Sequence, residues 1–124
     1  MSRFCVFLVD DDASVRKALG RLIRSFGYEV SIFASAAEVF TAMSHQKPDC
    51  LILDVQMPEM NGLDLVDQML DADHMVPLII ISAYEDERIR ERALQAGAIA
   101  FLQKPFNDQI LLDALHVALA EMTG

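Results

Sequence analysis

The chain has 124 residues, of which 53% are hydrophobic, and its formal net charge is −9. This length suits one domain, which we expect to span residues 1–124, and the acidic balance argues against direct nucleic-acid contact, because phosphate binding needs clustered Lys and Arg. No apolar stretch approaches the roughly 20 residues of a transmembrane helix and no secretory signal pattern opens the chain, so we expect a cytoplasmic protein without membrane contact.

The first expected strand covers residues 4–9, a continuously apolar run that leads directly into the acidic triplet Asp10–Asp12. A helix follows, and either Asp12 or Ser14 can cap its start. Apolar residues lie on one face of this helix: Val15, Leu19, Leu22, Ile23 and Phe26. Gly27 suits the left-handed backbone position that commonly follows a helix end.

Residues 28–32 alternate between apolar and polar side chains, which predicts an edge strand with one wetter face. Ser35 followed by Glu38 forms a capping box, which predicts the start of a second helix. A turn is expected at residues 47–49. The unbroken aliphatic run of residues 50–54 then predicts a central strand that is buried on both faces and ends in a carboxylate.

The second half of the chain continues this alternation. A third helix is expected from Asn61, and a fourth strand over residues 78–81 ends at Ser82. A charge-rich helix is expected over residues 86–96. Gly97 predicts its end.

The last strand is expected over residues 99–102, ending near Lys104, and Asn107 is expected to cap a last helix. Strand and helix thus alternate about five times, which predicts an α/β fold with a five-stranded parallel sheet and helices on both faces. Right-handed crossovers place the carboxyl ends of the strands on one edge, where ligands of such folds bind.

Cysteines and histidines are the other residues of this chain that could bind a metal or carry redox chemistry. Cys5 and Cys50 both fall in predicted strands, so we expect buried thiols without a disulfide. The three histidines are far apart and lie beside no cysteine, so the spacing of zinc ligands is absent. None of the five glycines falls in a phosphate-binding pattern.

The predicted strand ends deliver five polar side chains to one edge of the sheet: Asp10, Asp11, Asp54, Ser82 and Lys104. Clustered carboxylates repel one another unless a cation lies between them, and Mg²⁺ prefers such oxygen ligands. A carboxylate can also attack phosphorus, and an ammonium and a hydroxyl can stabilise the transferred group. Taken singly, the acids could favour a helix N-terminus, the serine could be a cap and the lysine a surface residue.

Four segments together resemble the receiver domain of bacterial two-component response regulators: residues 7–12, 53–62, 80–83 and 104–106. The similarity covers essentially the whole chain, and residues 103–106 resemble the FixJ-type transcriptional regulators. The resemblance implies a CheY-like, flavodoxin-like (βα)5 fold with strand order 2-1-3-4-5.

The resemblance also implies a phosphoacceptor and a metal site. Asp54 would accept a phosphoryl group from a phosphohistidine on a sensor histidine kinase. Asp11 and Asp54 would bind Mg²⁺ (or Mn²⁺) directly, Asp10 would help through water, and Gln56 would offer its backbone carbonyl. The chain would then not be an enzyme, apart from catalysing its own phosphorylation and dephosphorylation.

The resemblance further implies a switch. Lys104 would pair with the phosphoryl oxygens, Ser82 would move to bind the phosphoryl group, and Phe101 would turn inward behind it. Many relatives have Thr and Tyr at these last two positions; Phe lacks a hydroxyl, so packing alone would distinguish its two positions unless it is a static core aromatic. The Lys104-Pro105 peptide bond would be cis.

The expected output is a repacked face made by the fourth helix, fifth strand and fifth helix. In relatives this face binds partners or a second receiver, so we expect a possible homodimer there. Either the chain is a stand-alone receiver, or an output domain with a DNA-binding helix-turn-helix follows residue 124. The FixJ-type resemblance favours the second, which would make transcription the regulated process.

Two rival functions are left open. A haloacid-dehalogenase-type phosphatase would use Asp10 as the nucleophile and Asp54 as a supporting residue, because those enzymes carry an Asp-x-Asp pattern after a strand. A binding module could keep the fold without ever accepting phosphate. Phosphorylation in Mg²⁺ distinguishes a receiver from the phosphatase, and beryllofluoride binding distinguishes a receiver from the binding module.

Overall fold

The computed structural model describes residues 4–55, 64, 67, 76–83, 87–95 and 97–123. Five parallel strands form one sheet in the order β2-β1-β3-β4-β5, as predicted. The strands are β1 (Cys5–Val9), β2 (Glu29–Phe33), β3 (Cys50–Asp54), β4 (Leu78–Ser82) and β5 (Ala100–Gln103). The helices are α1 (Ala13–Ser25), α2 (Ala36–Met43), α4 (Glu87–Gln95) and α5 (Asp108–Thr123).

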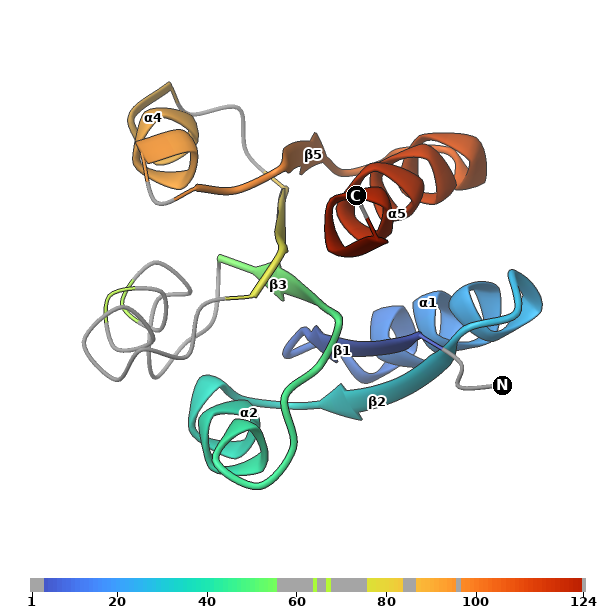
Figure 1. Ribbon diagram of the computed structural model, residues 1–124. Helices are drawn as coiled ribbons and strands as arrows, with labels where there is room; N and C mark the ends of the chain where they lie inside the picture. The colour runs from blue at the N-terminus through green and yellow to red at the C-terminus, as the bar shows by residue number, and fades with distance from the viewer. Residues whose placement is uncertain are drawn as a thin grey trace.

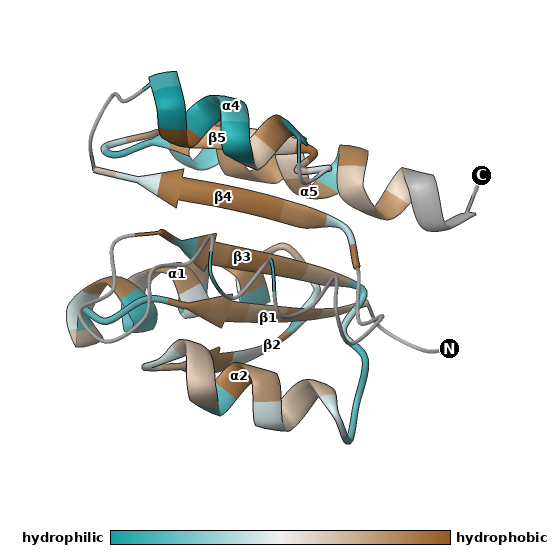
Figure 2. Ribbon diagram, turned by 90° about the vertical axis from the view of Figure 1, so that its left-hand side faces the viewer, coloured by the Kyte–Doolittle hydropathy of each residue, from teal (hydrophilic) through white to brown (hydrophobic). Residues whose placement is uncertain are grey.

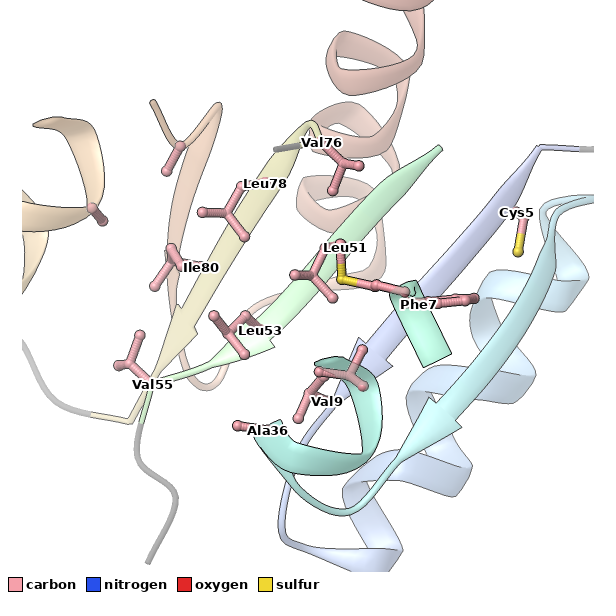
Figure 3. Close-up of a cluster of buried hydrophobic side chains, with 14 residues drawn as sticks. Cys5, Phe7, Val9, Ala36, Leu51, Leu53, Val55, Val76, Leu78 and Ile80 are labelled. Atoms are coloured by element: carbon pink, nitrogen blue, oxygen red, sulfur yellow. The ribbon is translucent and has the colours of Figure 1, made fainter. Parts of the chain in front are cut away.

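The core has two layers, one on each face of the sheet. Helices α2 and α4 lie on one face, and α1 and α5 lie on the other (Figure 1). Along β3, Leu51 and Leu53 pack in the layer beneath α2 and α4 (Figure 3), whereas Cys50 and Ile52 pack in the opposite layer. Because alternate residues of β3 supply both layers, every position before its terminal Asp54 is apolar.

Hydrogen bonds at the helix ends explain where the first two helices begin. Asp12 rather than Ser14 caps α1, since the Asp12 carboxylate accepts from the backbone N–H groups of Ser14 and Val15. Ser35 caps α2 and accepts from the Glu38 N–H at 3.2 Å. The Glu38 carboxylate accepts from the Ala34 N–H at 2.8 Å, so the return bond of the capping box lies one residue upstream of its usual partner.

The end of strand β5 differs slightly from the sequence-based expectation. Strand β5 runs to Gln103, one residue past the apolar run, because Gln103 pairs with Ser82 at the end of β4. Ile32 on the edge strand is 38% exposed, which reflects the position of β2 at the margin of the sheet. Gly27 and Gly97 both have positive φ, at 96° and 90°, as a residue following a helix requires.

Further expectations concern the two cysteines, the third helix and membrane spans. Cys5 and Cys50 are buried free thiols, in agreement with the prediction. The third predicted helix lies outside the described residues, except that Asp64 and Asp67 have helical backbone. Among the described residues, no helix combines the length and apolar character needed to cross a bilayer.

Candidate functional site at the carboxyl edge of the sheet

Four of the predicted site residues lie at or just after the ends of parallel strands. The arrowheads of β1, β3 and β4 point toward the same edge (Figure 2). Asp10 follows β1, Asp54 ends β3, Ser82 ends β4, and Lys104 follows β5. Parallel pairing in register therefore brings residues that are up to 94 positions apart in the sequence to one place.

Three carboxylates form the centre of the site. Asp10, Asp11 and Asp54 each offer an oxygen atom, and these atoms lie within 4.8 Å of one another. Asp10 and Asp54 are buried, whereas Asp11 is exposed. This set of hard oxygen donors, open to solvent on one side, fits a divalent cation such as Mg²⁺. The backbone carbonyl of Gln56, predicted as a further ligand, lies outside the described residues.

Lys104 provides positive charge to this cluster. Its Nζ lies 2.8 Å from Asp10 Oδ2 and 3.5 Å from Asp54 Oδ2. Burial alone would lower the pKa of Lys104, but the hydrogen bonds and charges of the two aspartates outweigh burial and raise it above its usual range. The lysine therefore stays protonated, and its charge partly offsets the cost of burying two carboxylates.

The Lys104 backbone is fixed by the neighbouring strand. Its N–H donates to the Ser82 carbonyl at 2.7 Å, and the Lys104-Pro105 peptide bond is cis, as expected. Ser82 itself is fully buried. The described residues thus bring together all the acids, the amine and the strand that carries the hydroxyl.

Asp10 makes more contacts than the sequence predicted. Its N–H donates to the Phe33 carbonyl, and its Oδ1 accepts from the Asp12 N–H at 2.9 Å. Its own carbonyl accepts from Arg16 Nη1 at 2.7 Å. Arg16 was not identified from the sequence, and the only available signal was a basic residue in the second turn of a helix that follows an acidic loop.

Phe101 lies on β5 beside β4, where it pairs with Ile80, two residues before Ser82. Its side chain is half-buried and packs against the core layer beneath α2 and α4. The guanidinium carbon of Arg90, on α4, lies 6.0 Å from the centre of the Phe101 ring. This distance permits a cation–π interaction between α4 and β5.

Residues 6–116 match the family model of the response regulator receiver domain. The response regulator protein TodT of Pseudomonas putida is 40% identical over 114 residues, which are 92% of this chain and 50% of TodT. The transcriptional regulatory protein TdiR of Thauera aromatica is 41% identical over 115 residues, 93% of this chain and 51% of TdiR.

The chain therefore spans about half the length of these curated relatives. Among solved structures, the crystal structure of FixJ-N superposes with a TM-score of 0.89 at 30% identity, and the match covers 97% of this chain and 96% of that one. The sheet order, the acidic edge and these matches agree with one another. The chain belongs to the family of response regulator receiver domains.

Proposed function

We propose that this chain is the phospho-accepting domain of a two-component response regulator, with Asp54 as the acceptor. A phosphohistidine on a sensor histidine kinase would be the donor. The observation that carries the proposal is the buried Asp54 carboxylate at 3.5 Å from the Lys104 ammonium, beside Asp10 and the exposed Asp11. This arrangement leaves a nucleophile, a cation and a solvent-facing acid at one open edge.

The phosphoryl transfer forms one covalent bond and breaks one. A carboxylate oxygen of Asp54 forms a bond to phosphorus as the phosphorus–nitrogen bond of the phosphohistidine breaks, and the electron pair of that bond returns to the imidazole. The Lys104 ammonium balances charge on the phosphoryl oxygens, and the Ser82 hydroxyl donates to one of them. Asp11 and Asp54 would hold Mg²⁺ or Mn²⁺, which supplies further charge neutralisation when bound.

We propose that the output is a change on the face made by α4, β5 and α5. When Ser82 binds the phosphoryl group, the space it leaves lets Phe101 turn inward. Three large apolar side chains on α4 and α5 are exposed on the described part of the chain, namely Leu94, Ile110 and Val117 at 54%, 43% and 52%. These residues support docking of a second copy or of an output domain, with transcription as the regulated process.

Phosphorylation by a small donor tests the proposal. Acetyl phosphate and Mg²⁺ should add one phosphoryl group to the chain, seen by intact mass, and Asp54→Asn should abolish the addition. If Asp54→Asn still gains phosphate while Asp10→Asn does not, the acceptor is wrong and the phosphatase alternative gains support. A chain that takes no phosphate and shows no response to beryllofluoride would instead be a binding module.

A further inference from the structure

Arg16 is tied to the acidic edge by a contact that the proposed function does not use. It lies in the second turn of α1 and is half-buried. Its Nη1 donates to the backbone carbonyl of Asp10 at 2.7 Å, across six residues. A charged donor to a carbonyl is stronger than a neutral one, so this contact restrains the path of the chain between β1 and α1.

The contact completes the hydrogen bonding of Asp10. Its N–H, its carbonyl and its two carboxylate oxygens each have a protein partner: Phe33 O, Arg16 Nη1, Asp12 N and Lys104 Nζ. Asp10 is fully buried, so the loss of any one of these partners leaves a polar atom without compensation. These hydrogen bonds therefore fix the position of Asp10, and this holds the neighbouring, exposed Asp11 close to Asp54.

We infer that Arg16 is a positioning residue for the divalent ion. By holding the Asp10 carbonyl, its guanidinium sets the turn that places Asp11 against Asp54, and so sets the affinity of the acidic cluster for the ion. The inference deepens the proposed function and rests on its ion site. Arg16 does not itself contact a carboxylate in the described contacts, so its effect passes through the backbone of Asp10.

Charge and position predict opposite effects of removing Arg16. If only its charge mattered, a neutral side chain would leave the carboxylates more attractive to a cation, and the ion would bind more tightly. If Arg16 acts by positioning the Asp10 carbonyl, its removal frees the chain between β1 and α1, and the ion binds more weakly. Groups that orient metal ligands typically change metal affinity by about 10- to 100-fold when they are lost, and the lower value suits a backbone contact.

The test is Mn²⁺ binding to the whole chain, measured by electron paramagnetic resonance without any phosphodonor. Arg16→Met should weaken Mn²⁺ binding about tenfold. Arg16→Lys keeps the charge and one donor and should recover part of the affinity. Arg21→Met removes the same charge from an exposed site further along α1 and should bind Mn²⁺ as the wild type does.

Thermal unfolding separates affinity from folding. If Arg16→Met does not fold, Arg16→Lys carries the test, with an expected loss of about threefold. Affinity equal to or tighter than that of the wild type, in a folded Arg16 variant, overturns the inference and leaves the ion site standing. If the wild type itself does not bind Mn²⁺, the ion site of the proposed function fails, and the role of Arg16 fails with it.

Discussion

The ammonium of Lys104 lies closer to Asp10 than to the proposed acceptor, at 2.8 Å from Asp10 and 3.5 Å from Asp54. Lys104 is therefore primarily the counter-ion of the fully buried Asp10 carboxylate. A divalent ion at the same cluster would compete with this ammonium for the negative charge. Stability and ion binding are consequently coupled through one side chain.

Replacing Lys104 by Met should separate these two effects. Without metal, the variant should lose on the order of 2 kcal/mol of stability, less than the loss of a fully buried partner because Lys104 is 24% exposed. Its Mg²⁺ affinity should rise, because the carboxylates lose their internal cation. Denaturant unfolding in EDTA measures the stability without metal, and unfolding in Mg²⁺ measures the stabilisation by the ion. Equal stabilisation of wild type and variant by Mg²⁺ would contradict the competition between the ion and the Lys104 ammonium.

Asp12 belongs to the helix rather than to the ion site. Its carboxylate accepts from two N–H groups of the first turn of α1. Asp12→Ala should therefore lower the free energy of unfolding by about 1 kcal/mol, and Asp12→Ser should restore most of it. Both variants should bind Mn²⁺ as the wild type does; a large loss of affinity in Asp12→Ser would assign Asp12 to the ion instead.

The contact between Arg90 and Phe101 should favour the half-buried position of the ring. A cation–π interaction at an exposed site contributes about 0.5–1 kcal/mol, so Arg90→Met should tighten beryllofluoride binding by roughly threefold if Phe101 turns inward on activation. Titration followed by amide NMR gives the affinity, with Arg21→Met, at an exposed site on α1, as the control. Identical affinities in all three proteins would make Phe101 a static core residue.

Cys50 should make stability sensitive to alkaline pH. Burial, and secondarily the charge of Asp49, raise the pKa of the Cys50 thiol from 9.0 to about 12. The folded state thus prefers the protonated thiol, and the stability this gives is complete below pH 9 and is lost as the pH rises toward 12. The slope of unfolding free energy against pH should therefore be shallower in Cys50→Ala than in the wild type, by up to about 1.4 kcal/mol per pH unit. Parallel slopes in urea unfolding would contradict the raised pKa.

Most of the fold could be predicted from the pattern of hydrophobic residues in the sequence. The aliphatic run of β3 must supply two core layers, and the alternation in β2 marks an edge. Once the strands are parallel, the residue after each strand is forced to the same edge, which is why Asp10, Asp54 and Lys104 could be grouped from sequence alone.

The finer arrangement of the site could not be predicted in this way. Arg16 donates to a backbone carbonyl, and a carbonyl acceptor leaves no trace in the pattern of side chains. Arg16 also lies among other basic residues of α1, such as Lys17 and Arg21, which share its charge but not its contact with Asp10. The preference of Lys104 for Asp10 depends on differences below 1 Å, which tertiary packing decides.

The most direct measurement is to locate the phosphorylated residue. After reaction with acetyl phosphate in Mg²⁺, borohydride reduces an acyl phosphate to an alcohol, and peptide mass spectrometry identifies the modified side chain. Asp54 should be reduced, and the other aspartates should stay unmodified. Reduction at Asp10 or Asp11 with Asp54 intact would contradict the assignment of Asp54 as the phosphoacceptor.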